Sequence, residues 1–423
     1  MSGHPADPPA APSLHPAHTV RIPRPLPVER PSQLDLPEEL RQLRSELPVA
    51  PLAFPDGPPG WLVTGYDHVR AALADPRLSS RRPHLNSHVR ASLITSAEMA
   101  VLRPSDLLTS DPPEHTRLRR LVAGQFTTRR IHKLAPRIQT IVDNHLDTLA
   151  AAPGPVDLMA VVALPVPCLV ISELLGVPFA DRDQYQRLTT ELLSLDRTRD
   201  QLLASKAELK NYLLHLIAAR REQPSDDLLS GLLHAQAGDP KLTDDEIAAL
   251  AQLILIAGHE TTANVLGLAV LLLLRPPRLW EIVRRRPGLV DGVIEETLRY
   301  ATVLQFGLLR VAREPLTIAG QPIQTGERVV LHLPAANRDP NRFTDPDCFV
   351  PDRPDAAKHL SFGHGPHHCI GDQLARTELH TLLTTMLRCF PALRLATADP
   401  GQIPTHTHRV VHGPAQLFVH VTA

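Results

Sequence analysis

The sequence predicts a mainly α fold with small β-sheets, and three observations support that prediction. Apolar residues recur with helical spacing along most of the chain. The longest such pattern covers residues 244–274 and opens with Thr243-Asp-Asp-Glu246, a capping box that marks the start of a helix. Residues 308–333 are instead β-branched and punctuated by glycine, as short strands are.

The elements can be assigned in order along the chain. A strand at Trp61–Thr64 precedes a short helix at residues 66–74, and Asp75-Pro76 closes that helix. Residues 81–105 show no sustained period and are expected to form a long loop. Further helices are expected at 114–125, 132–151, 165–176, 181–192, 198–221, 226–236, 278–286, 289–301 and 370–389.

Composition excludes several classes of function. The chain has 423 residues, of which 43% are hydrophobic and 21% charged, as in an ordinary globular protein. A formal net charge of −1 provides no basic field for nucleic acid or for an anionic membrane. The four cysteines show no pairing rhythm, which favours a reducing compartment over a disulfide framework.

The N-terminus is rich in proline. Residues 1–31 contain nine prolines and no apolar run, so we expect a disordered or extended arm followed by a single domain at 32–423. No signal peptide or spanning helix is expected there. The apolar run at Val265–Leu274 is about half of the roughly 20 residues that a bilayer crossing needs. The protein is expected to be cytoplasmic and not bound to a membrane.

The most informative segment is residues 360–371, Leu-Ser-Phe-Gly-His-Gly-Pro-His-His-Cys-Ile-Gly. It places Cys369 between a glycine-rich turn and an amphipathic segment, where a helix N-terminus favours the thiolate. The glycines allow a flat ligand to approach the backbone, and a thiolate there suits a haem iron. A structural cysteine is one alternative. A zinc site built from His364, His367, His368 and Cys369 is another, although no second cysteine lies nearby.

This segment resembles the haem-binding signature of the cytochrome P450 family. Every position of that signature is filled, by Phe362, Gly363, Gly365, His367, Cys369 and Gly371. The resemblance implies the cytochrome P450 fold and haem b (iron protoporphyrin IX), with Cys369 as the metal ligand and Phe362 and Gly363 against the cofactor. The motifs resemble those of soluble bacterial, actinomycete-type members.

A second motif, Ala257-Gly-His-Glu-Thr-Thr262, lies in the middle of the long helix. Threonine inside a helix can compete for a backbone carbonyl, so we expect a buried polar kink rather than a solvated face. The stretch resembles the oxygen-activating motif of the family. The resemblance assigns catalytic roles to Glu260 and Thr261, a carboxylate and a hydroxyl that relay protons while dioxygen is activated.

A third motif is the basic segment that follows Asp111-Pro-Pro-Glu. His115 and Arg119 share one helical face, and such a patch alone is often merely solvated. The resemblance places His115, Arg119, Arg310 and His367 on the haem propionates. Arg117 and Arg120 are expected to point outward.

A fourth motif pairs Glu296 with Arg299 at helical spacing, which alone predicts only a weak ion pair. The resemblance joins Arg353 to this pair. All three residues are then structural and support the core beside the haem.

The expected activity follows from the resemblance. It is a haem-thiolate monooxygenase that hydroxylates or epoxidises a lipophilic small molecule, such as a polyketide or another secondary metabolite. The chain carries no motif for a flavin or iron–sulfur domain. Electrons from NAD(P)H are therefore expected to arrive through a ferredoxin reductase and a ferredoxin. Docking candidates are Arg117, Arg120 and Arg376, and the protein is expected to be a monomer.

The substrate pocket is predicted only by position in the fold. Its expected apolar lining is Leu93, Ile94, Leu255, Val303, Leu304 and Phe306. His406, His408 or Arg409 would meet a polar or anionic group of the substrate. The same fold also allows coupling, dehydrogenation or peroxide-driven oxidation, and a haem-thiolate binding protein without turnover is a further alternative.

Overall fold

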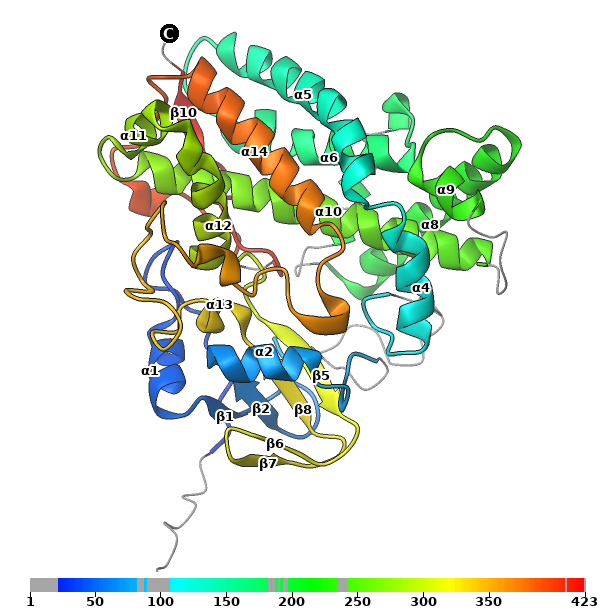
Figure 1. Ribbon diagram of the computed structural model, residues 1–423, viewed down its shortest axis with the longest axis vertical. Coiled ribbons are helices and arrows are strands. Elements are labelled where there is room, and N and C mark those ends of the chain that lie inside the picture. Colours follow the sequence, from blue (N-terminus) through cyan, green and yellow to red (C-terminus); the bar gives the residue numbers. More distant parts are fainter. Residues whose placement is uncertain are drawn as a thin grey trace, which may run out of the picture.

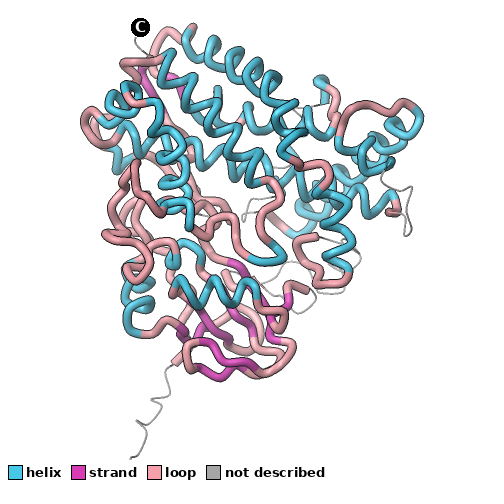
Figure 2. The backbone as a smooth tube through the Cα atoms, viewed as in Figure 1, coloured by secondary structure: helices cyan, strands magenta, loops and turns pink. Residues whose placement is uncertain are grey.

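A computed structural model shows a helical layer resting on a smaller sheet region. It describes residues 22–81, 87–89, 107–181, 184, 187–188, 191–192, 197–234, 242–407 and 409–421. Helices fill the upper part of Figure 1, and the larger sheet lies at the opposite end with α2 beside it. Figure 2 shows the strands gathered mostly at that end. The predicted fold class, mainly α with small β-sheets, is confirmed.

The helices match the predicted pattern closely. They are α1 (Glu38–Glu46), α2 (Tyr66–Ala74), α4 (Glu114–Ala123), α5 (Thr128–Ala150), α6 (Pro165–Leu175), α8 (Arg199–Glu222), α9 (Leu228–His234), α10 (Asp244–Leu274), α11 (Leu279–Arg285), α12 (Val290–Tyr300), α13 (Leu333–Ala336) and α14 (Asp372–Cys389). Helix α1, the short α13 and a π-helical turn at Met159–Ala163 were not predicted. Half of the residues of the helix expected at 181–192 lie outside the described residues, and those described at 184, 187–188 and 191–192 are helical. Most of the loop at 81–105 also lies outside the described residues.

The strands form three sheets. They are β1 (Val49–Leu52), β2 (Gly60–Val63), β3 (Leu78–Ser79), β4 (Val156–Asp157), β5 (Leu308–Ala312), β6 (Leu316–Ile318), β7 (Gln321–Ile323), β8 (Arg328–Leu331), β9 (Arg394–Leu395) and β10 (Phe418–His420). The largest sheet has the order β1-β2-β8-β5-β3. Its central pair, β2 and β8, is parallel, and the neighbouring pairs are antiparallel.

Side chains of this sheet alternate between two hydrophobic clusters, as the two-residue period of a strand requires. Val329 and Leu331 of β8 join the cluster that contains α2, whereas Val330 between them joins a cluster on the other face. That second cluster also contains Leu26, so the segment at 22–31 packs on the sheet. Both faces of the sheet are therefore covered.

Helix α10 is the central element of the helical layer, and the side chains along most of its length are buried. The predicted capping box is present: the Glu246 N–H lies 3.2 Å from Thr243 Oγ1, and the Glu246 carboxylate accepts from the Thr243 N–H at 2.7 Å. By length and composition α10 could cross a membrane. However, 72% of its most apolar window is buried inside the protein, as in the core helix of a globular domain.

A buried ion network ties α12 to the loop that precedes the Cys369 segment. Glu296, Arg299 and Arg353 are almost fully buried, and Glu296 accepts from both arginines at 2.7–3.1 Å. The Arg299 guanidinium also donates to three carbonyls of the loop, those of Asn337, Pro346 and Cys348. All five of its N–H donors thus have acceptors, which offsets the cost of burying its charge.

Asn337 extends this network toward Cys369. Its side-chain amide donates to Ser361 Oγ at 2.9 Å, and its side-chain oxygen accepts the Leu360 N–H at 2.7 Å. The residue after Ser361, Phe362, accepts the Cys369 N–H at 2.8 Å. A continuous path of hydrogen bonds and chain therefore joins α12 to the Cys369 segment.

This network generates a stability prediction. Arg299→Ala removes one of two cations from the buried Glu296 carboxylate, and breaking such a pair costs about 3–5 kcal/mol. The urea midpoint of unfolding, followed by circular dichroism, should fall sharply. Arg285→Ala, which breaks the exposed pair with Glu281, is the matched control and should leave the midpoint nearly unchanged. Equal effects of the two substitutions would contradict the structural role of Arg299.

Candidate functional site

The Cys369 segment is held in a fixed turn between the helices and the sheet (Figure 1). Gly363 and Gly365 have φ of +72° and +73°, a left-handed conformation that favours glycine. A Cβ on Gly365 would lie 2.9 Å from Cα of Ala74 in α2. The sequence suggested that these glycines make room for a flat ligand; at Gly365 the close neighbour is instead the α2 backbone.

The thiol of Cys369 lies three residues before α14, rather than inside its first turn. Burial raises its pKa, and a hydrogen bond from the Gly371 N–H only partly opposes this. The hydrogen bond from the Gly371 N–H acts in the direction expected from the sequence, but in the protein without bound metal it is outweighed by burial. A neighbouring metal ion would reverse the balance, because a coordinating thiol is deprotonated outright.

Three separate elements bring four cationic or basic side chains together. His115 and Arg119 come from α4, Arg310 from β5, and His367 from the turn at Gly365–His367. The rings of His115 and His367 have centroids 4.1 Å apart. His115 is buried, and its Nε2 atom has no hydrogen-bond partner among the described residues.

The two arginines of this cluster place positive charge beside its histidines. Burial, followed by the charges of its neighbours, lowers the pKa of His367 to about 3, and burial lowers that of Arg310 to about 10. Asp111 is the carboxylate that opposes these shifts, and it already accepts hydrogen bonds from Ser79 and Ser80. The cluster lacks matching negative charge and fits an anionic group such as the propionates of a haem.

The donor set at Cys369 also bears on the zinc alternative. Within the described part of the chain, no group of three or more His, Cys, Asp or Glu residues is arranged to hold a metal ion. A single sulfur ligand beside a basic cluster suits a haem iron, because the porphyrin nitrogens would supply four further ligands. The residues present therefore fit haem better than zinc.

The middle of α10 contains two side chains that bond back to the preceding turn. Thr261 Oγ1 donates to the Ala257 carbonyl at 2.6 Å, and Asn264 Nδ2 donates to the Glu260 carbonyl at 2.8 Å. Such bonds compete with the helix ladder, as predicted for Thr261. The adjacent Glu260 side chain is fully buried.

Among the residues that the structure describes, the carboxylate of Glu260 has one charged neighbour, Arg409. Glu260 Oε1 lies 3.4 Å from Arg409 Nη1, and burial raises the pKa of Glu260 to about 7 although Arg409 opposes the shift. The sequence suggested Arg409 only as a substrate contact. No signal in the sequence could reveal this pair, because 149 residues separate its members.

The proposed docking cations differ in accessibility. Arg117 pairs with Glu114 and with Glu246, and therefore ties α4 to the start of α10 instead of pointing outward. Arg376 pairs with Glu295 and Asp372, and its guanidinium lies 4.6 Å from the centre of the Phe362 ring. Only Arg120 of the three is exposed, and it has no ion-pair partner among the described residues.

The predicted pocket residues belong to different clusters. Leu255 and Val303 are buried in the main helical cluster, Leu304 packs against the α2 cluster, and Phe306 lies in the cluster with Leu26. Leu93, Ile94 and His408 lie outside the described residues. The loop at 409–412 lies against this part of the chain, since the His412 N–H donates to the Val303 carbonyl and Val411 bridges to Leu304.

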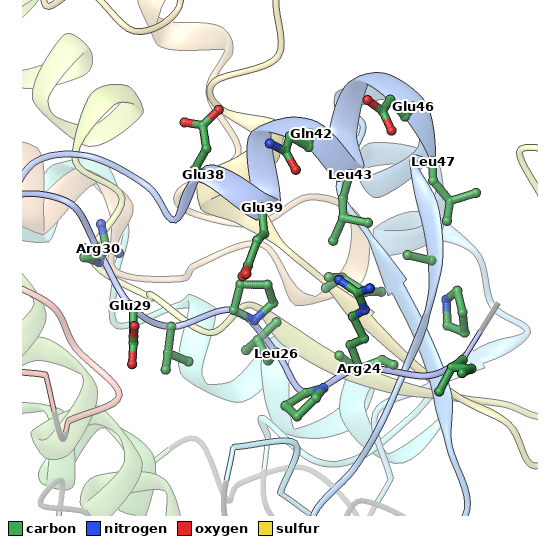
Figure 3. Close-up of a pocket in the computed structure, with 18 of the residues that line it drawn as sticks. Arg24, Leu26, Glu29, Arg30, Glu38, Glu39, Gln42, Leu43, Glu46 and Leu47 are labelled. Atoms are coloured by element: carbon green, nitrogen blue, oxygen red, sulfur yellow. The ribbon is translucent and has the colours of Figure 1, made fainter.

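A large surface groove lies elsewhere, between the segment at 22–31, α1 and the first two strands (Figure 3). Its volume is about 1120 Å³. Glu38, Glu39 and Glu46 of α1 border it, and Leu26 and Leu43 contribute apolar surface. None of the residues expected to contact haem or oxygen lines this groove.

Comparison with known proteins gives a consistent result. The family model for cytochrome P450 matches residues 59–286 and 287–419. The chain is 43% identical to cytochrome P450 105C1 of a Streptomyces species, over 90% of this chain and 94% of that protein. It is 39% identical to 20-oxo-5-O-mycaminosyltylactone 23-monooxygenase of Streptomyces fradiae, over 93% of this chain and 91% of that protein.

The fold agrees with these relatives. The crystal structure of CYP105P1 in complex with filipin I superposes with a TM-score of 0.87 at 38% identity. The match covers 95% of this chain and 100% of that one. The chain therefore belongs to the cytochrome P450 family of haem-dependent monooxygenases.

Proposed function

We propose that this protein inserts oxygen into a lipophilic secondary metabolite, such as a polyketide, by hydroxylation or epoxidation. The observation that carries the proposal is the joint placement of a single thiol, Cys369, and a basic cluster that lacks a matching anion. Two relatives support the substrate class, since one is named as a monooxygenase of 20-oxo-5-O-mycaminosyltylactone and another was crystallised with filipin I.

Each side chain of the site would have a separate role. Cys369 would ligate the iron, and His115, Arg119, Arg310 and His367 would hold the propionates. Bound haem supplies the chemistry of dioxygen activation. Thr261 would hold a proton at its hydroxyl, and Glu260 would exchange protons with it, either directly or through water. Phe362 and Gly363 would border the cofactor on the thiolate side.

Electrons would come from a separate protein. Soluble relatives of this type receive them from a ferredoxin that a ferredoxin reductase serves with NAD(P)H. Arg120 is the remaining candidate for the docking surface, because Arg117 and Arg376 are engaged in ion pairs. We further propose a monomeric, cytoplasmic protein whose residues 32–423 form one haem domain, with the segment at 22–31 packed on its sheet.

Cys369→Ser tests the ligand assignment. The reduced carbon monoxide complex of the wild-type protein should show the red-shifted Soret band of a thiolate ligand, and the variant should lose it. Cys348→Ser, at an exposed cysteine, is the control and should keep the band. Retention of the band in Cys369→Ser would contradict the assignment.

Thr261→Ala tests proton delivery. A positioned proton donor contributes about 10²–10⁴-fold to a rate, so the variant should form far less product per dioxygen consumed and release hydrogen peroxide instead. Thr261→Ser retains the hydroxyl and should restore most of the coupling. The measurement compares product, peroxide and dioxygen consumption in one assay. Unchanged coupling in Thr261→Ala would refute the role.

A panel of lipophilic and polyketide-type compounds tests the substrate class. A blue shift of the Soret band upon titration would identify compounds that displace water from the iron. Turnover of such a compound with labelled dioxygen should place one labelled oxygen atom in the product. Turnover without label would indicate dehydrogenation or coupling, and a shift without any turnover would favour the binding-protein alternative.

A further inference from the structure

The Glu260 carboxylate is buried with incomplete compensation. Its side chain has no exposed surface, and Oε2 has no hydrogen-bond partner among the described residues. A buried carboxylate in this position would normally become protonated, because burial penalises its charged form. The guanidinium of Arg409, 3.4 Å from Oε1, is the charged group that opposes protonation.

The segment that carries Arg409 is fixed in place by backbone bonds. The Gln305 side chain donates to the Arg409 carbonyl, and the Gln305 N–H donates to the Val410 carbonyl at 3.3 Å. The next residues bond to the chain beside Gln305, since Val411 bridges to Leu304 and the His412 N–H donates to the Val303 carbonyl. Arg409 therefore extends from an anchored backbone.

The same segment packs directly on the turn of α10 that follows Glu260. A Cβ on Gly413 would lie 2.1 Å from Asn264 Oδ1, so only glycine fits between loop and helix. Asn264 in turn donates to the Glu260 carbonyl at 2.8 Å. The loop and the backbone of Glu260 are thus held at a fixed separation.

The other titratable groups that face Arg409 are histidines. Burial, with a smaller contribution from Arg409, lowers the pKa of His259 on α10 and of His406 on the loop to about 4. Both are therefore neutral near pH 7. Within the described part of the chain, Glu260 is the group near Arg409 that carries negative charge.

We propose that Arg409 is a positioning residue that lets the buried Glu260 carboxyl group release its proton near neutral pH and so relay protons to Thr261. The proposal rests on the proposed monooxygenase function. In each cycle Glu260 would take a proton from solvent water and pass the same proton toward the Thr261 hydroxyl, so the carboxylate ends as it began. The Arg409 side chain is 25% exposed. It would provide the fixed positive charge that this transfer of protons through Glu260 requires.

The first test measures the ionisation of Glu260 directly. Infrared difference spectra across a pH titration report the protonated carboxyl, and Glu260→Gln identifies its band by removing it. Arg409→Gln should move the midpoint upward by about 1 to 3 pH units, which is the usual effect of an adjacent arginine. Arg409→Lys keeps the charge and should restore much of the shift. An unmoved midpoint in Arg409→Gln would overturn the proposal.

The second test uses turnover. Without Arg409 the carboxyl stays protonated to higher pH, so the pH profile for product formed per dioxygen consumed should shift upward in Arg409→Gln. The substitution should have no further effect in a Glu260→Gln background. Weaker substrate binding with an unchanged pH profile would make Arg409 a substrate contact instead. If the wild-type protein lacked the thiolate-type carbon monoxide band, the proposed function would be refuted. The infrared titration of Glu260 does not depend on that function, so the two outcomes can be distinguished.

Discussion

The buried Glu296 carboxylate organises the part of the protein on which the site depends. It binds Arg299 and Arg353, whose side chains are almost fully buried. Arg299 also donates to three carbonyls of the loop that leads to the Cys369 segment. Asn337 continues the connection to Leu360 and Ser361. The position of the thiol is therefore set by buried polar bonds that leave few groups unsatisfied. Hydrophobic packing alone would not define that position as sharply.

The basic cluster follows the opposite rule. Its two arginines place positive charge beside two buried histidines, whose pKa values are lowered by burial and then by neighbouring charges, and this arginine charge is a cost to the fold. A dianionic ligand would relieve that cost. The two sets of buried polar groups therefore differ: Arg299 has an acceptor for every N–H donor and builds the fold, whereas His115 Nε2 has no partner among the described residues and its cluster is suited to binding.

Local signals in the sequence predicted much of this arrangement. The capping box at Thr243 set the start of α10, and residue spacing placed His115 and Arg119 on one face. Helix α1 was missed although Glu38 and Glu39 in its first turn and Arg44 in its last are typical helix signals. The partners of Arg117 and Glu260 could not be predicted. Glu246 and Arg409 are distant in sequence, and only the tertiary fold brings them close. The roles of the individual site residues stay predictions.

The pairing of β2 with β8 has a consequence for biosynthesis. Trp61 of β2 and Glu327, the residue before β8, are hydrogen-bonded although 266 residues separate them. At about 5–20 residues per second, a ribosome needs about 13 s or more to supply the partner strand. Throughout that time the β1–β2 hairpin has an unpaired edge and apolar side chains on both faces. The nascent chain must therefore protect its first strands until nearly four-fifths of the protein has been made, and the sheet beneath the Cys369 segment is among the last parts to close.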